Sequence, residues 1–278
     1  MRHRVLKLLE NVGLAVFVAL LVVWSLLPIV WNFLTSIKQR VDLFAIPPRL
    51  LFEPTWEYYA AILRPGSRSI YPYLTNTVII AAGTTVLTLF LAALAAYALS
   101  RYTFKGRRVL LYSVLATRLL PPISAVVPLF LLLNTFRLID THLALVLIYS
   151  ALGVPFSVWL MKSFFDTVPK DIEESAMIEG CNRLQTLWYI TLPLAAPGLV
   201  ATGVFVLIMA WNEFMFAFMF TSVEAKTLPV LISESRGEDQ FLWQSMAATT
   251  TVLMLPPLFL GWYLQRYLTR GLTAGALK

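Results

Sequence analysis

Charged residues are scarce in this sequence. Asp, Glu, Lys and Arg together make up 13% of its 278 residues, whereas hydrophobic residues make up 59%. Soluble domains carry about 25% charged residues, so this chain has too few to cover a water-facing surface. Length alone would allow one or two soluble domains. The composition instead predicts an all-α integral membrane protein, a single transmembrane domain over residues 1–278 whose surface faces a lipid bilayer.

Other absences exclude further classes of protein. The chain has one cysteine, Cys181, and therefore cannot form an internal disulfide bond. Its two histidines, His3 and His142, lie far apart, and no cluster of metal ligands accompanies them. No G-x-x-x-x-G-K-[ST] motif occurs, so we do not expect the chain to hydrolyse ATP or to be an enzyme. The net charge of +7 does not indicate nucleic-acid binding, because the basic residues lie between apolar runs.

Six apolar segments are long enough to cross a bilayer as helices. The first is longer than the ~7–15 residues of a signal-peptide core, and no small-x-small cleavage site closes it. We therefore expect it to be a span rather than a signal peptide. The predicted spans are approximately residues 12–34, 73–100, 109–136, 143–161, 198–221 and 243–263.

The positive charges orient these spans. With the amino terminus inside, thirteen Lys and Arg residues fall in inner segments and eight in outer segments. Cytoplasmic loops carry the excess of Lys and Arg, and the short basic cluster Arg101–Arg108 is the strongest single indication. Both termini are therefore predicted to be cytoplasmic, with the loop 162–197 and the tail 266–278 on the same side.

Proline and polar residues mark the interior of two spans. Pro121, Pro122 and Pro128 interrupt the third span, which is either bent for packing or shaped to line a pathway. Intramembrane polar residues usually face the bundle interior or a cavity. Two readings stay open for them, a polar translocation pathway or a structural Arg118–Glu213 pair. The three residues are Arg118, Asn212 and Glu213.

The inner loop 162–197 contains helix signals. Asp171 is expected to cap a helix over Ile172–Glu179, with Glu174 completing a capping box. Gly180 stands where a left-handed residue would end that helix. An amphipathic stretch follows, and two prolines, Pro193 and Pro197, close it. The loop suits docking on another protein or, alternatively, lying on the membrane surface. The apolar positions of the amphipathic stretch are Leu184, Leu187, Trp188 and Leu192.

One motif in this loop resembles a known family. Glu174-Ser175-Ala176-Met177-Ile178-Glu179-Gly180, followed after nine residues by Ile190-Thr191-Leu192-Pro193, resembles the EAA loop of binding-protein-dependent ABC importer permeases. The family pattern is E-A-A-x-x-x-G and then I-x-L-P. The chain departs from it at Ser175, where alanine is usual, and has Glu179 and Cys181 where Asp and Ala are common. Secondary transporters and channels, the rival class, have no need of this loop.

Further segments are similar to the carbohydrate-uptake branch, of the maltose-transporter type. They are Ala210-Trp211-Asn212-Glu213-Phe214, Leu228-Pro229-Val230, Gln265-Arg266-Tyr267 and Gly271–Ala276. The resemblance implies a type I importer fold in a prokaryotic plasma or inner membrane. It also implies a second, unlike permease subunit, two ATPase subunits that bind ATP and Mg, and an external substrate-binding protein. No cofactor is expected in this chain, and the substrate would be an oligosaccharide or related polyol.

The resemblance also assigns roles to residues. The tail 266–278 would reach the ATPase, and the predicted contacts with the binding protein are Lys226, Leu228 and Pro229. The predicted ATPase-coupling residues are Glu174, Ser175, Ala176, Glu179, Gly180, Leu192 and Pro193.

Overall fold

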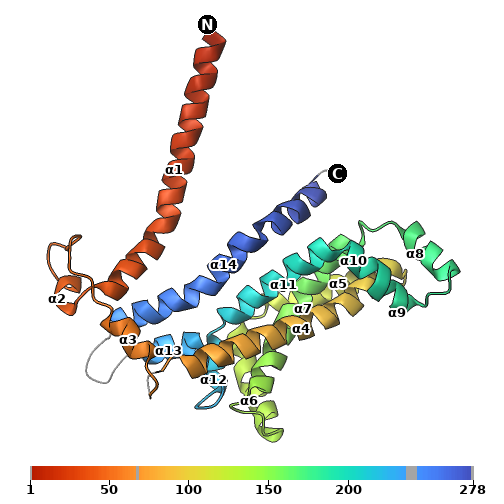
Figure 1. Ribbon diagram of the computed structural model, residues 1–278. Coiled ribbons are helices and arrows are strands. Elements are labelled where there is room, and N and C mark those ends of the chain that lie inside the picture. Colours follow the sequence, from red (N-terminus) through yellow and green to blue (C-terminus); the bar gives the residue numbers. More distant parts are fainter. Residues whose placement is uncertain (1, 67–68, 236–242, 277–278) are drawn as a thin grey trace. The chain divides into compact units, whose positions relative to one another are not determined.

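The computed structural model describes residues 2–66, 69–235 and 243–276, and side chains within residues 11–262 of these ranges and at Lys7. Every secondary-structure element in these ranges is a helix (Figure 1). The prediction of an all-α chain is therefore confirmed. Of the carboxy-terminal tail, only the backbone of residues 266–276 is described, so its predicted contact with an ATPase lies outside the described side chains.

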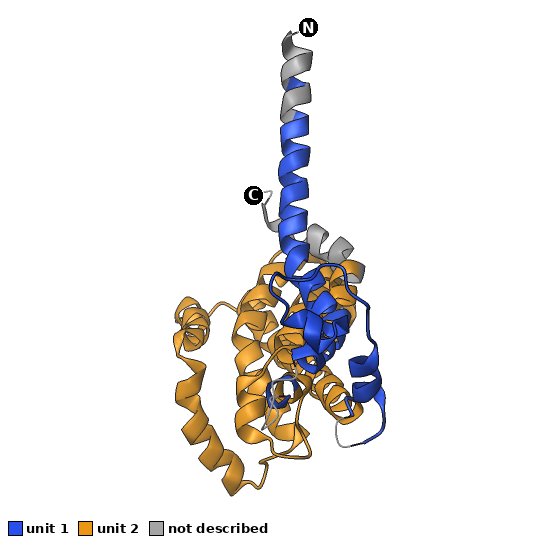
Figure 2. Ribbon diagram, turned by 90° about the vertical axis from the view of Figure 1, so that its left-hand side faces the viewer, with its two compact units in different colours: residues 1–70, 232–255 blue, residues 71–231, 256–278 orange. Residues whose placement is uncertain are grey.

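The described chain forms two compact units (Figure 2). Unit 1 comprises Met1–Ile70 and Ile232–Leu255, and unit 2 comprises Tyr71–Leu231 and Pro256–Lys278. Helices α13 (Leu228–Glu234) and α14 (Trp243–Ala276) each run from one unit into the other. The single transmembrane domain stays a prediction.

Unit 1 is built around the long helix α1 (Arg2–Ile37). Its segment Asn11–Ile37 is apolar and long enough to cross a membrane. No residue in the most apolar 18-residue stretch of this segment is buried. Near its end, the Asn32 amide donates hydrogen bonds to the carbonyl of Ala247 at 3.2 Å and to the hydroxyl of Thr251 at 3.0 Å. Two hydrogen bonds therefore attach α1 to the first part of α14. Two short helices complete this unit, α2 (Arg40–Leu43) and α3 (Glu57–Leu63).

Unit 2 has a core of three packed helices, α4 (Tyr71–Arg101), α7 (His142–Phe165) and α11 (Ala196–Trp211). Small residues allow this close packing, since Ala92, Ala93 and Ala96 of α4 are all buried in one apolar cluster. The contact of α11 with α7 is closer still. A Cβ added at Gly198 would lie 2.1 Å from the ring of Phe164.

The third predicted span is a bent pair of helices. α5 (Arg107–Ala116) continues into the 3₁₀ turn η1 (Thr117–Leu119), and a second turn η2 (Pro122–Ala125) leads into α6 (Val126–Thr135). The two halves meet at 93°. Proline cannot donate the helix hydrogen bond and disfavours helix in the residue before it, so the break falls at Pro121 and Pro122.

The fifth predicted span, 198–221, is not continuous. α11 ends at Trp211, and α12 (Met215–Phe220) begins only after a break. At its other end α11 meets the segment Arg183–Leu194 at 83°. Within the described residues, four helices are long and apolar enough to cross a membrane as single spans, and up to six spans result when each bent pair counts as one. The predicted number of six agrees with the second count, while the cytoplasmic position of the termini stays a prediction.

The inner loop forms the predicted helix–turn–helix with different boundaries. Its first helix is α8 (Lys170–Ile178), and its second part contains α9 (Arg183–Thr186), a π-helical turn η3 (Leu187–Thr191) and α10 (Leu192–Leu194). The predicted cap at Asp171 is wrong. Pro169, with its fixed φ, precedes the first turn without a side-chain cap, and Asp171 lies inside α8. The capping box forms instead between Asn182 and Gln185 of α9.

Candidate functional site

A buried ion pair joins α8 to the end of the long helix α4. Arg101 ends α4, and Glu173 lies in the first turn of α8. Nη2 and Nε of Arg101 lie 2.7 Å and 2.8 Å from Oε1 of Glu173. The two side chains are only 4% and 3% exposed. Loss of either partner would leave a buried charge without its counter-charge, at a cost of about 3–5 kcal/mol. The pair therefore fixes α8 to the end of α4.

Neighbouring groups complete the hydrogen bonds of this pair. Thr191 Oγ1 donates to Oε1 of Glu173 at 2.7 Å, and Tyr97 Oη donates to Oε2 at 3.3 Å. Arg101 Nη2 also donates to the backbone carbonyl of Val168 at 3.1 Å. A buried charge is tolerated when its hydrogen-bonding groups are satisfied in this way. The Glu173 carboxylate thereby holds α8, α4 and η3 together.

A second link attaches the end of α7 to the same place. Ser100 Oγ donates to Oδ1 of Asp166 at 2.6 Å, and Lys162 Nζ forms an ion pair with Oδ2 of Asp166. Arg101 Nη1 donates to Ser100 Oγ at 3.0 Å, which connects this link to the first. Displacement of α8 must therefore act on α4 and α7 together, because bonded contacts tie the ends of all three helices.

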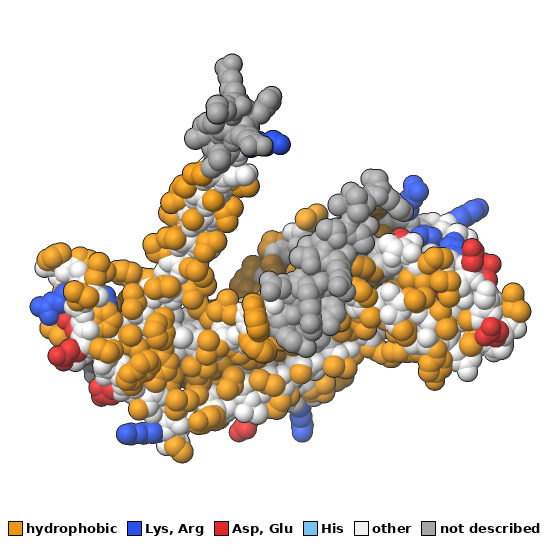
Figure 3. All heavy atoms as spheres, turned by 45° about the horizontal axis from the view of Figure 1, so that its top comes forward, with side chains coloured by type: hydrophobic (Ala, Val, Ile, Leu, Met, Phe, Trp, Pro, Cys, Tyr) orange, Lys and Arg blue, Asp and Glu red, His pale blue; other side chains and the backbone are white. Residues whose placement is uncertain are grey.

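The other face of α8 is turned outward. Ile178 is 87% exposed, and the acidic residues Glu174 and Glu179 are exposed as well. Figure 3 shows charged and hydrophobic side chains side by side over the part of the molecule that carries α8 and α9. An exposed surface of this mixed character suits contact with another protein. The predicted coupling residues Glu174, Ser175, Glu179, Gly180 and Pro193 are exposed, whereas Ala176 and Leu192 are buried.

Gly180 ends α8 as the sequence predicted. Its φ is +102°, in the left-handed region that side chains disfavour. The amide of Cys181 donates to the carbonyl of Ala176 at 3.0 Å, and the amide of Gly180 donates to that of Met177 at 3.1 Å. These two bonds are those of a Schellman motif. No atom lies within 4 Å of a Cβ added at Gly180, so the glycine is required by backbone conformation alone.

The three polar residues predicted within the spans each have separate hydrogen-bond partners. Arg118 is exposed in η1 and contacts Sδ of Met209 at 3.6 Å. Within the described residues, Arg118 and Glu213 form no ion pair. Glu213 lies in the break after α11 and accepts two backbone N–H groups of the first turn of α12, at 3.0 Å and 3.3 Å. The Asn212 amide donates to the carbonyl of Ile208 at 2.8 Å. Glu213 thus serves as the cap of α12, and the pathway role stays a prediction.

At the other end of α4, one carboxylate organises a loop. Asp140 accepts the amides of residues 222–225, at distances of 2.9–3.1 Å, and the hydroxyl of Ser222 at 2.8 Å. Partial burial alone would raise the pKa of Asp140, but these hydrogen bonds outweigh it and hold the pKa well below its usual range. The loop 222–225 is therefore held by a carboxylate that stays ionised.

The predicted binding-protein contacts follow this loop. Leu228 is fully buried, and its amide donates to Thr77 Oγ1 at 2.9 Å, so its side chain supports the loop from beneath. Lys226 and Pro229 are partly buried, while residues 222–224 are exposed. A contact role for Lys226, Leu228 and Pro229 stays a prediction, and part of the charged run that follows lies outside the described residues.

Comparison with known families decides the class of the chain. Residues 88–274, which include α8 and Gly180, match the family of binding-protein-dependent transport system inner membrane components. The chain belongs to this family. It is therefore a multi-pass transport permease of the inner membrane, as the EAA-like loop predicted.

Individual relatives of this chain are also transport permeases. It is 37% identical over 280 residues to the trehalose/maltose transport system permease protein MalG of Thermococcus litoralis, across 100% of this chain and 99% of the relative. It is 34% identical over 274 residues to the inner membrane ABC transporter permease protein YcjP of Escherichia coli K12, across 98% of each chain. Its fold matches a crystal structure of a bacterial ABC transporter involved in the import of alginate, with a TM-score of 0.77 at 22% identity, over 93% of this chain and 96% of that one.

Two residues of the permease site were not singled out from sequence. The sequence indicates Arg101 only as one of the basic residues that orient the spans, and Glu173 only as an acidic residue near the positive end of a helix. A signal for both existed, since Glu173 shares a helix face with Ala176, three residues on, while Glu174 does not. Arg101, the first charged residue after an apolar span, was its natural partner.

Within the described ranges, no group of three or more His, Cys, Asp and Glu side chains is placed to hold a metal ion.

Proposed function

We propose that this permease forms half of the translocation pathway for a sugar, an oligosaccharide or related polyol, and takes force from a separate ATPase through α8. The sugar assignment is supported by the relative named for trehalose/maltose transport. It is also supported by the resemblance of residues 210–214 to the W-N-E signature of sugar-type permeases.

One observation carries the coupling proposal, the buried Arg101–Glu173 ion pair. A partner that grips the exposed face of α8 cannot move this helix without moving α4, because the pair and Thr191 bind the two together. α4 in turn packs along α7 and α11. ATP binding in the partner would then bias the spans between two states, a coupling that is reciprocal between the nucleotide and the transported sugar.

The partners follow from the same proposal. A second, unlike permease subunit completes the pathway, two ATPase subunits bind ATP and Mg, and an external binding protein delivers the sugar. The proposed ATPase contacts are Glu174 and Ser175 on the exposed side of α8, Glu179 and Gly180 just past its end, and the exposed Pro193 of α10. Ala176 and Leu192 support this surface from within. The chain itself holds no cofactor and catalyses no reaction.

The test is reconstitution of the whole complex with its binding protein in liposomes. ATPase activity is measured while candidate sugars are supplied one at a time, and uptake of the stimulating sugar is then followed with radiolabel. We expect one class of sugar to stimulate both, and uptake to stop when the ATPase subunits are left out. Uptake that persists without the ATPase subunits would identify a secondary transporter instead.

A further inference from the structure

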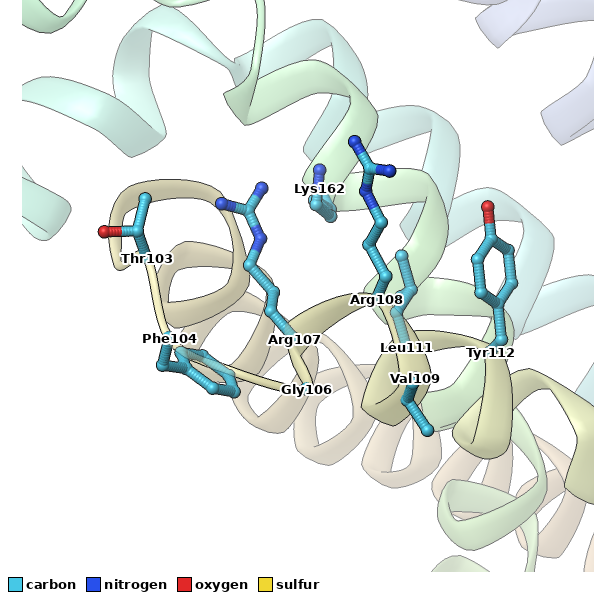
Figure 4. A pocket seen from close by; sticks show the side chains of 9 residues that line it. All are labelled: Thr103, Phe104, Gly106, Arg107, Arg108, Val109, Leu111, Tyr112 and Lys162. Carbon is cyan, nitrogen blue, oxygen red and sulfur yellow. The ribbon is translucent and has the colours of Figure 1, made fainter.

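A basic cavity lies near the ends of α4 and α7. It has a volume of about 610 Å³ and is lined by the α4–α5 connection, the first turns of α5 and the last part of α7. Figure 4 shows the ends of Arg107, Arg108 and Lys162 directed toward the same space. The three cations come from two segments that are far apart in sequence. Their convergence is therefore a product of the fold.

The positive charge of this cavity is only partly compensated. Lys162 forms an ion pair with Asp166, which leaves further N–H donors on its ammonium group. Among the residues that the structure describes, Arg107 Nη1 donates only to the backbone carbonyl of Tyr102, at 3.4 Å. Arg108 forms no ion pair with any described acidic residue. No acidic side chain lines the cavity, so an anion would enter a site of net positive charge.

The cavity lies at the polar end of three membrane helices. It adjoins the end of α4, the start of α5 and the end of α7, the same ends that hold α8. Large apolar side chains around it are exposed, among them Phe104, Val109 and Tyr112. Tyrosine favours the boundary between headgroups and hydrocarbon. The surroundings therefore combine cations at headgroup level with an apolar surface that continues along α5.

We propose that this cavity binds the phosphate headgroup of an anionic membrane phospholipid, with its acyl chains along the exposed apolar face of α5. Paired arginines suit phosphate oxygens, because a guanidinium presents several donors in a fixed plane. Free phosphate shares the headgroup chemistry but has no use for the apolar surface. Basic pockets between membrane helices recognise lipid headgroups by the same chemistry.

The experiment uses the assembled permease–ATPase complex in nanodiscs of phosphatidylcholine with a graded fraction of phosphatidylglycerol. Phosphatidylglycerol that stays bound after extraction is counted by native mass spectrometry. The test variant is R107Q/R108Q, and the matched control is K105Q, which removes a charge from the same loop outside the cavity. Each cation near a membrane surface contributes a factor of roughly five in anionic lipid binding, so we expect retention to fall about 25-fold in the double variant and by no more than about fivefold in K105Q.

Further variants keep the outcome decisive. R108Q alone is compared if the double variant does not assemble, and R107K/R108K, which keeps both charges, should retain the lipid. Equal loss in K105Q and R107Q/R108Q would overturn the proposal, because the effect would then be one of diffuse surface charge. It would also be overturned if inorganic phosphate stabilised the complex while phosphatidylglycerol was not retained. Loss of ATPase association with unchanged lipid retention would make the ATPase the occupant, and would likewise refute it.

Discussion

Arg101 and Glu173 are 72 residues apart in sequence, and their side chains form a buried ion pair with an N–O distance of 2.7 Å. The next residue, Glu174, points outward on α8. Two adjacent glutamates therefore have different roles. Glu173 connects α8 to the membrane helices, while Glu174 is presented to a partner.

The first prediction concerns Glu173→Gln. This change keeps the size of the side chain but leaves the Arg101 charge buried without its counter-charge. We expect a loss of about 3–5 kcal/mol in the free energy of unfolding. In complexes that still assemble, stimulation of the ATPase by the loaded binding protein should decrease by a factor of roughly 5 to 150, the range of typical allosteric couplings. Unfolding is measured in mixed micelles and stimulation in liposomes.

Glu174→Gln is the matched control for stability. The same atoms change one residue away, but the side chain is exposed, so the free energy of unfolding should move by no more than about 0.5 kcal/mol. Its effect should fall on association with the ATPase subunits. Equal stability of the two variants would contradict the role given to the Arg101–Glu173 pair.

The second prediction concerns the end of α8. Gly180→Ala meets no atom, so its whole cost is backbone strain at positive φ, about 1–2 kcal/mol. Gly180→Asn should cost less, because asparagine tolerates this conformation better. Gly180→Val should cost most and lower coupling without preventing insertion. Membrane insertion, ATPase stimulation and uptake are measured for all three, and an order other than Asn, Ala, Val would show that contact with a partner governs this position.

These variants separate what sequence could and could not predict. The spans could be predicted because a run of apolar residues must become a helix in hydrocarbon. Gly180 could be predicted because helix ends often require a left-handed residue and glycine supplies it. The start of α8 was placed wrongly, since Asp171 carries the residue type of a cap while Pro169 sets the boundary.

The contacts that build the site depend on the fold. Arg101 and Thr191 both bind Glu173 only in the folded chain, because Arg101 is 72 residues away from Glu173 in sequence, so no local pattern encodes these contacts. The break after Trp211 contains neither proline nor glycine, so periodicity extended the helix through it. Glu213 was read as an intramembrane charge for the same reason, although it caps the helix that starts there.

The third prediction tests that cap. Glu213→Ala removes both acceptors of the α12 amides and should cost about 1 kcal/mol in the free energy of unfolding. Glu213→Gln keeps one acceptor and should cost less than half as much. The dependence of uptake on sugar concentration should be the same in both variants. A shifted concentration dependence at unchanged stability would favour the translocation pathway over the cap.

The last prediction concerns pH and Asp140. Its hydrogen bonds to residues 222–225 favour the carboxylate, so the folded pKa lies below the ordinary value of about 3.9. A group whose pKa is depressed by folding stabilises the fold fully above the unfolded pKa and loses that contribution as pH falls toward the folded one. Protection of amides 222–225 from hydrogen exchange, corrected for the intrinsic rate, should therefore be constant from neutral pH to about pH 5 and decline below about pH 4.

Asp140→Asn removes this dependence at its source. The amide offers one acceptor oxygen and turns N–H donors toward the N–H donors of the loop, so protection at neutral pH should fall by about 1–2 kcal/mol and no longer decline below about pH 4. Glu224→Gln is the control, because only the backbone of Glu224 takes part in the contact.

Since the exposed loop 222–224 lies beside the predicted binding-protein contacts, stimulation by the loaded binding protein should weaken in Asp140→Asn alone. Unchanged protection in this variant would mean that Asn76, which donates to the carbonyls of Glu224 and Lys226, holds the loop without Asp140.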